Sequence, residues 1–201
     1  MYKIFFKRLI AFFIALCCLP FVLVTLVILG PIIYFTDRGP IFYNAIRTGK
    51  NVKQFKMYKF RSMYVNAPDI RNADGSTFNS NDDPRVTPIG RFMRKTSVDE
   101  IPQLLNVLLG DMTFVGPRPT LGTDQKLRDM DAVCQKRYSV RPGITGYAQA
   151  YFRNSIGQDD KFKWDSYYVD HISLWMDIKI LWQTARSVIK HENVFVENTN
   201  K

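Results

Sequence analysis

Residues 91–119 read RFMRKTSVDEIPQLLNVLLGDMTFVGPRP and combine basic residues, an acidic pair, an apolar run and a proline-fixed turn. Apolar side chains recur at helical spacing after the acids, which predicts a helix over Ser97–Asp111. The acids, Asp99 and Glu100, are adjacent in the sequence. Adjacent carboxylates among cations suit phosphate chemistry with a divalent metal, because one carboxylate can hold the metal while another attacks phosphorus.

The same acidic pair also has a purely structural interpretation. Ser97-Val98-Asp99-Glu100 fits the Ser-x-x-Glu capping box that starts many helices, where the helix dipole favours acids. Pro102 fits the first helical turn only if Asp99 or Glu100 is the cap residue. The residues alone leave capping and catalysis both open.

An apolar segment precedes this region, because residues 9–36 contain no charged side chain. Leu9–Phe35 exceeds the roughly 20 residues that span a bilayer. Pro20 removes a helix hydrogen bond near its middle, and the two halves measure about 17 and 22 Å at about 1.5 Å per residue. Basic residues on both flanks favour two cytoplasmic ends. Both a re-entrant helix–break–helix and a kinked transmembrane helix remain open.

Composition indicates one domain with anionic partners. The 201 residues carry a net charge of +10 and a pI near 9.6, which suits phosphorylated substrates, acidic lipid head groups or nucleic acid. The three cysteines form no readable disulfide framework, which favours a reducing compartment.

The rest of the chain predicts an α+β fold that is mostly helical. The last expected helix is amphipathic, and it suits either core packing or a membrane interface lined by tryptophan. The expected elements are a strand at Gln54–Phe60, a loop at Asn66–Pro88, a polar helix at Asp124–Tyr138, a tight loop at Arg141–Gly146 and the amphipathic helix at Ser173–Lys190.

Several basic residues are candidates for binding phosphate. Arg118 lies in Gly-Pro-Arg-Pro and Arg141 in Arg-Pro-Gly, where proline restricts the backbone and can hold a guanidinium as a bidentate clamp. The expected substrate-binding set is Lys59, Arg61, Arg94, Arg118, Arg141 and Arg153.

Six motifs in one order make the chain resemble a known family. The sequence resembles the bacterial sugar transferase family, which comprises monotopic polyprenyl-phosphate phosphoglycosyl transferases, in its minimal PglC-like form. The motifs are YKFRSM (58–63), DPRVTPIG (83–90), DEIPQLLNV (99–107), GDM (110–112), VGPRP (115–119) and RPGITG (141–146).

The resemblance implies a reaction and a location. Members transfer a sugar 1-phosphate from a UDP-sugar to undecaprenyl phosphate with Mg²⁺ and release UMP, on the cytoplasmic face of the bacterial inner membrane. It implies that Asp99 is the nucleophile and metal ligand, that Glu100 helps hold the metal, and that Arg118 binds phosphate. It also implies a re-entrant membrane helix at residues 1–36 and a catalytic domain at 37–201, with interfacial amphipathic helices and anionic lipid around it.

Three positions depart from the family pattern. Leu19-Pro20 replaces a Ser-Pro pair at the helix break, and Ala11 replaces an Asp found in many members. Tyr151-Phe152-Arg153 replaces Asn-Gly-Arg, which we expect to alter the sugar pocket.

A function of another class is a membrane-anchored basic module that binds anionic lipid or a partner without catalysis. It accounts for the charge and the apolar segment but not for the acidic pair or the arginines beside proline. Nucleic-acid binding is not expected, because no recognised module or stacking motif accompanies the basic charge.

Overall fold

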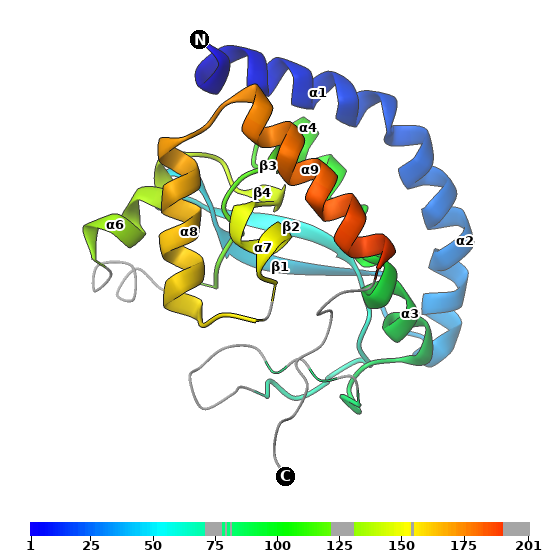
Figure 1. Cartoon of the computed structure of the whole chain (residues 1–201). Helices are drawn as coiled ribbons and strands as arrows, with labels where there is room; N and C mark the ends of the chain where they lie inside the picture. Colours follow the sequence, from blue (N-terminus) through cyan, green and yellow to red (C-terminus); the bar gives the residue numbers. More distant parts are fainter. Residues whose placement is uncertain (71–77, 79, 81, 122–130, 154, 191–201) are drawn as a thin grey trace.

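Two N-terminal helices bend around an α+β body in the computed structural model, which describes residues 1–70, 78, 80, 82–121, 131–153 and 155–190 (Figure 1). The mostly helical α+β prediction agrees with this architecture. The described elements are the π-helix η1 (Tyr2–Phe6), α1 (Lys7–Cys17), α2 (Leu19–Asp37), β1 (Phe42–Thr48), the 3₁₀ turn η2 (Lys50–Val52), β2 (Gln54–Phe60), α3 (Pro88–Thr96), the 3₁₀ turn η3 (Val98–Glu100), α4 (Gln103–Leu109), β3 (Thr113–Val115), α6 (Ala132–Gln135), the 3₁₀ turn η4 (Lys136–Ser139), β4 (Gly143–Thr145), α7 (Tyr147–Tyr151), α8 (Gln158–Asp170) and α9 (Leu174–Ile189).

The apolar segment is broken near its middle, as predicted. Cys18 separates α1 from α2, and Pro20 occupies the second position of α2. A proline at this position costs no intrahelical hydrogen bond, because the first N–H groups of a helix have no partner within it. With 19 residues, α2 is long and apolar enough to cross a membrane by length and composition.

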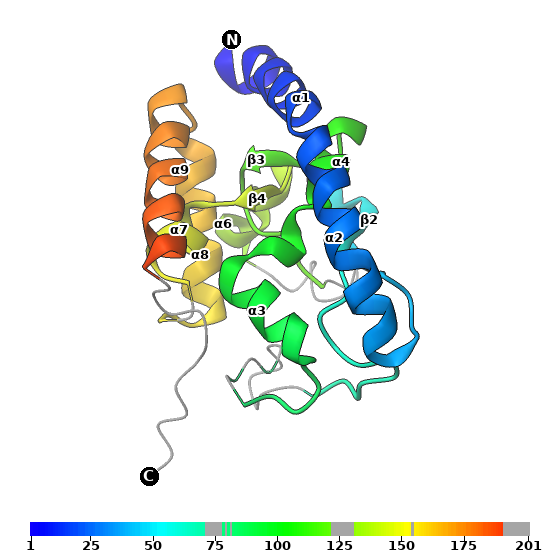
Figure 2. The same cartoon turned by 90° about the vertical axis from the view of Figure 1, so that its right-hand side faces the viewer.

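Both halves of the segment pack along the body on their inner sides (Figures 1 and 2). Ala11, Ala15 and Val22 share a buried cluster with residues of β1, β2 and α4. Leu29 and Ile33 join Phe60 and Met93 in a second cluster. The small side chain of Ala11, only 3% exposed, lets α1 approach the body at a position where many family members carry Asp.

The basic pair at the start of α1 ties the segment to the body. Lys7 Nζ lies 2.5 Å from Asp177 Oδ2 on α9, and both side chains are largely buried. Arg8 donates to the carbonyl oxygens of Val107 and Leu108 at the C-terminal end of α4. The membrane segment is therefore bonded to two elements of the body.

The antiparallel hairpin β1–β2 runs from Phe42 opposite Phe60 to Thr48 opposite Gln54. The predicted strand Gln54–Phe60 is confirmed, whereas β1 was not predicted. On the free edge of β2, the buried amide of Asn106 accepts from the Tyr58 N–H at 3.0 Å and donates to the Lys56 oxygen at 2.7 Å. Asn106 thus takes the place of a neighbouring strand and fixes α4 beside β2.

A second, parallel pair joins β3 to β4, so the prediction of a simple loop at Arg141–Gly146 is wrong. A Cβ atom on Gly143 would lie 2.1 Å from the Gly116 nitrogen. Glycine is therefore needed at this position, because two backbones approach more closely than any side chain allows.

The predicted helix near the C-terminus is confirmed as α9, but the core-packing interpretation of its apolar face is wrong. Its inner face consists of Asp177, Ile180, Thr184 and Ser187, and the two threonine hydroxyls of Thr184 and Thr145 lie 2.7 Å apart. The apolar face points outward, with Trp175 65% and Trp182 73% exposed. The face that packs against the body is therefore mostly polar, with Ile180 and Met176 adding apolar contacts to a buried cluster.

Two predictions lie partly outside the described residues. Of the expected loop Asn66–Pro88, residues 71–77, 79 and 81 are not described, and Pro88 begins α3. Of the expected helix Asp124–Tyr138, residues 131–138 are described, and they form the short helix α6 and the turn η4.

Candidate active site

The acidic pair lies in the short turn η3 between two helices. Helix α3 begins at Pro88, capped by the Thr87 side chain, and ends at Ser97, which has a left-handed backbone with φ 59°. The predicted helix Ser97–Asp111 is confirmed over Gln103–Leu109 but wrong at its start, because Ser97 stops one helix and Pro102 is the N-cap of the next. The Ser97 side chain makes no capping hydrogen bond, so the capping-box interpretation is also wrong.

Cations from two other elements face these carboxylates. Lys59 Nζ on β2 lies 2.6 Å from Glu100 Oε1 and 3.7 Å from Asp99 Oδ2. Arg118 Nη2, from the turn after β3, lies 3.6 Å from the same Glu100 oxygen. The Asn106 bonds between α4 and β2 explain this geometry, because they hold the strand that carries Lys59 against the helix that follows Glu100.

The two carboxyl groups have opposite electrostatic character. Burial raises the pKa of Asp99, and the nearby charge of Glu100 raises it further, against the opposing effect of Lys59. Burial also acts to raise the pKa of Glu100, but Lys59 and Arg118 together lower it to about 2. Glu100 is therefore a fixed anion, whereas Asp99 is a buried carboxyl whose charge is less stabilised.

Arg94 completes the cationic surroundings from the last turn of α3. Its Nε donates to Ser62 Oγ at 3.0 Å. Burial lowers the pKa of Arg94, and the negative charges of Asp99 and Asp83 oppose that shift. The structure thus brings Lys59, Arg94 and Arg118 together around the acidic pair.

Hydrogen bonds from β4 and η4 hold the turn that carries Arg118 in place. The Gly143 N–H donates to the Pro117 oxygen at 3.0 Å, and Arg137 Nη2 donates to the Arg118 oxygen at 2.6 Å. Arg137 also forms a buried ion pair of 2.6 Å with Asp165 on α8. The Arg118 side chain itself is 55% exposed, so its guanidinium can reach a ligand.

The other predicted basic residues have different surroundings. Arg61 forms two bonds of 2.6 Å with the Asp37 carboxylate at the end of α2. Arg141 Nε donates to the Gly110 oxygen at 2.7 Å, beyond the far end of α4 from the acidic pair. Arg153 is half-buried after α7, with a left-handed φ of 46°. Their substrate-binding roles stay predictions.

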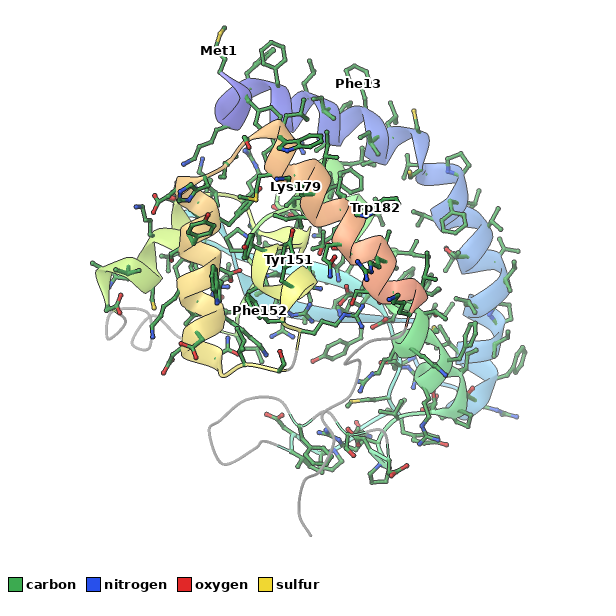
Figure 3. The ribbon with its side chains drawn as sticks, viewed as in Figure 1. Met1, Phe13, Tyr151, Phe152, Lys179 and Trp182 are labelled. Atoms are coloured by element: carbon green, nitrogen blue, oxygen red, sulfur yellow. The ribbon has the colours of Figure 1, made fainter. Side chains whose placement is uncertain are left out.

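The residues before Arg153 belong to an aromatic cluster between α7 and α8. Phe152 stacks on Trp164 with ring centroids 5.1 Å apart, and Trp164 stacks on Tyr147 at 5.3 Å. Figure 3 shows Tyr151 and Phe152 at the lower end of α7. The departure from the family pattern at this position therefore adds aromatic rings to a packed cluster.

Sequence reasoning missed Ser62, Gln103, Arg137 and Asp165, which contact the site or its supports. Gln103, at the first position of α4, lies beside Glu100 and helps to lower its pKa. Proximity to the acidic pair in sequence could have identified Gln103. Asp165 could not be identified in this way, because it lies 66 positions after Asp99 and is placed by tertiary packing.

The donor set at the acidic pair fits magnesium that is shared with a phosphate ligand. Mg²⁺ prefers oxygen ligands and is commonly held by one or two carboxylates together with substrate phosphates. Asp99 and Glu100 offer such carboxylates. Over the described residues, no group of three or more His, Cys, Asp or Glu side chains could hold a metal. Water and phosphate oxygens would complete the coordination.

Comparison with known proteins identifies the family. The model of the family described as "Bacterial sugar transferase" matches residues 2–191. The chain belongs to the bacterial sugar transferase family. This bacterial sugar transferase is 41% identical over 170 residues to the undecaprenyl-phosphate galactose phosphotransferase of Salmonella typhimurium, covering 79% of the chain and 35% of the relative.

Other relatives agree with this assignment. The undecaprenyl-phosphate glucose phosphotransferase of Komagataeibacter xylinus is 41% identical over 184 residues, with 86% of this sugar transferase and 33% of the relative aligned. The uncharacterized sugar transferase EpsL of Bacillus subtilis is 43% identical over 156 residues, with 78% and 73% aligned. The chain therefore spans about a third of the length of the Salmonella and Komagataeibacter relatives.

Proposed function

We propose that this bacterial sugar transferase is a polyprenyl-phosphate phosphoglycosyl transferase, which moves a sugar 1-phosphate from a UDP-sugar to undecaprenyl phosphate and releases UMP. The observation that carries the proposal is the buried Asp99–Glu100 pair facing Lys59 and Arg118. The names of the Salmonella and Komagataeibacter relatives, both undecaprenyl-phosphate sugar phosphotransferases, support the same reaction.

In the first step, a carboxylate oxygen of Asp99 attacks the phosphorus that bears the sugar. A bond forms between this oxygen and phosphorus, the bond from phosphorus to the bridging oxygen breaks, and the electron pair leaves with UMP. The half-exposed Arg118 guanidinium can bind two phosphate oxygens at once, which orients the diphosphate for attack. Lys59 adds positive charge beside the reacting carboxylate.

In the second step, an oxygen of undecaprenyl phosphate attacks the phosphorus of the phosphosugar-aspartyl intermediate. The bond from phosphorus to Asp99 breaks and the free carboxylate returns. Glu100 remains ionised throughout, because Lys59 and Arg118 hold its pKa at about 2.

We further propose that Asp99 and Glu100 bind Mg²⁺ jointly with the diphosphate of the substrate. The ion would neutralise charge on the phosphate oxygens during transfer.

The location that this function requires is the cytoplasmic face of the bacterial inner membrane. The family and the apolar helix α2 indicate membrane association. We propose that α1 and α2 enter and leave the same leaflet as a re-entrant unit. The outward apolar face of α9 would lie on that surface, with Lys179 and Arg186 near anionic head groups. Figure 3 shows Trp182 and Lys179 on α9, and Phe13 pointing away from the body on α1.

The test is turnover with a panel of UDP-sugars and undecaprenyl phosphate in the presence of Mg²⁺. We expect UMP release from at least one donor. With that donor and no lipid acceptor, mass spectrometry should find a phosphosugar on the peptide that contains Asp99. Asp99→Asn should reduce turnover by at least about 10³-fold, because it removes the nucleophile. Binding to anionic vesicles without UMP release from any donor would instead favour the non-catalytic basic module.

A further inference from the structure

The main chain of Arg118 lies against one buried ion pair, which contacts it at its carbonyl oxygen and faces its N–H. The Arg118 carbonyl oxygen accepts from Arg137 Nη2 at 2.6 Å. The Arg118 N–H faces the Asp165 carboxylate and acts to lower the pKa of that group, against the larger raising effect of burial. Arg137 and Asp165 in turn pair with each other at 2.6 Å, with side chains only 2% and 4% exposed. Arg118, Arg137 and Asp165 therefore form a closed ring of interactions.

The surroundings of the pair hold it rigidly. The Arg137 guanidinium lies over the Phe162 ring on α8, 4.3 Å from its centroid. The Tyr138 hydroxyl, next along η4, lies 2.8 Å from Thr120 Oγ1, just beyond Pro119. The supports thus come from α8 and η4 and converge on the turn that carries Arg118.

A contribution to folding stability does not by itself explain why the protein contains the buried ion pair of Arg137 and Asp165. Replacing a buried ion pair by apolar side chains of similar volume is often neutral or stabilising, because two charges must lose their water. The cost is not fully offset here, since Arg137 Nε is a buried nitrogen without a hydrogen-bond partner among the described residues. The pair does, however, fix the base of Arg118 while leaving its guanidinium exposed.

We propose that Arg137 and Asp165 are positioning residues that fix the Arg118 main chain and so aim its guanidinium at the diphosphate of the donor. The inference rests on the proposed function only for the identity of that ligand. A guanidinium on a fixed base loses less conformational freedom on binding, so the pair increases affinity without touching the substrate.

The first experiment measures hydrogen exchange at the Arg118 amide, which needs no turnover. Pro117 and Pro119 have no N–H, so Arg118 is the only exchanging main-chain amide of residues 117–119. Asp165→Asn should accelerate its exchange by about tenfold, because a charged acceptor becomes a neutral one. The matched control is Asp170→Asn, which breaks the exposed 2.5 Å pair with Lys136 that joins the same two elements. The control should leave Arg118 exchange unchanged.

The second experiment measures UMP release kinetics in a double-mutant cycle. Asp165→Asn should raise KM for the UDP-sugar by about tenfold and change kcat less. In an Arg118→Ala background the same substitution should have no further effect on KM. An equal effect in both backgrounds would overturn the proposal, because it would show that Asp165 acts without Arg118. Unaltered Arg118 exchange in Asp165→Asn would overturn it as well.

Failure of the proposed function has a different signature. If wild-type protein releases UMP from no donor, that function is wrong, and the exchange measurement still decides whether the pair fixes Arg118. If Asp165→Asn does not fold, the double replacement Arg137→Met with Asp165→Leu removes both contacts with Arg118 without leaving a buried charge. Faster exchange of the Arg118 amide in this folded variant than in the wild type supports the proposal. An exchange rate equal to that of the wild type overturns it.

Discussion

Among single residues, Asp99 is buried at a cost in stability, which the proposed role as nucleophile would account for. Its raised pKa means that the folded protein disfavours the ionised form, so stability falls as pH rises through the region between the unfolded and folded pKa values. Asp99→Asn cannot ionise, and we expect its Tm at pH 7 to exceed that of the wild type. The difference should disappear at pH values below the unfolded pKa. A lower Tm than wild type at pH 7 would contradict this account.

Glu100 should behave in the opposite way. Its folded pKa of about 2 lies below the ordinary value of 4.5, so its ionised form stabilises the fold above pH 4.5. Glu100→Gln should lower the free energy of unfolding at pH 7 by about 1–3 kcal/mol, through loss of the charged bond to Lys59. The deficit should shrink as pH falls from about 4.5 toward 2. Chemical denaturation at pH 7 and pH 3 measures it, and a deficit that does not depend on pH would refute the assignment.

The sequence predicted the acidic pair and three of its cations but placed Arg61 in the same group. Both Lys59 and Arg61 were expected at the site because they are basic residues of one motif, YKFRSM, at the end of the predicted strand. β2 ends at Phe60, however, and Arg61 turns to Asp37, 24 positions earlier in the chain. A pairing between residues so far apart in sequence is decided by tertiary structure and has no local signature.

Among the elements, α4 and β2 are joined through Asn106. Asn106→Ala would leave the Tyr58 N–H and the Lys56 oxygen without this partner, at a cost of about 2–3 kcal/mol in unfolding free energy. We also expect lower turnover, because Lys59 would no longer be held opposite Glu100. The matched control is Asn44→Ala on the exposed side of β1, which should change stability by less than about 0.5 kcal/mol. Equal losses in the two variants would rule out this role of Asn106.

The spacing of apolar residues in the sequence predicted where helices and strands lie better than it predicted what packs against each of their faces. Gln54–Phe60 and the helix that became α9 were predicted from apolar spacing alone. The same spacing could not indicate that α9 turns a mostly polar face inward around Ile180, because an apolar stripe looks the same whether protein or lipid covers it. The break at Ser97 also lacked a signal, since serine rarely adopts the left-handed backbone that ends α3.

For the whole molecule, the re-entrant topology predicts that both ends of the membrane segment lie in the cytoplasm. Single cysteines at Lys3 and Lys50, both exposed, should resist an impermeant thiol reagent outside intact cells and react once the membrane is opened. The background must lack Cys17, Cys18 and Cys134. Labelling of position 3 from outside would mean that the segment spans the bilayer.

Pro20 provides the matched variant for this topology experiment. Pro20→Leu removes the proline at the second position of α2 and permits one continuous helix of about 40 Å at about 1.5 Å per residue, long enough for a tilted span. The basic flanks still oppose transfer of the N-terminus, so we expect a mixture of topologies. The inverted fraction should lose activity, and an entirely wild-type labelling pattern would show that Pro20 does not set the topology.

The bonds from Arg8 to the end of α4 have a practical consequence for work on this enzyme. The helix that follows the acidic pair is capped by a side chain of the membrane segment, and the two share one buried cluster. A soluble fragment beginning at Asp37 would therefore expose the apolar sides of β2 and α4 and would aggregate rather than serve as a catalytic core for inhibitor screening. If the proposed transferase function is correct, compounds that loosen α1 from α4 should inhibit it from within the lipid phase, without competing with the UDP-sugar or the lipid phosphate.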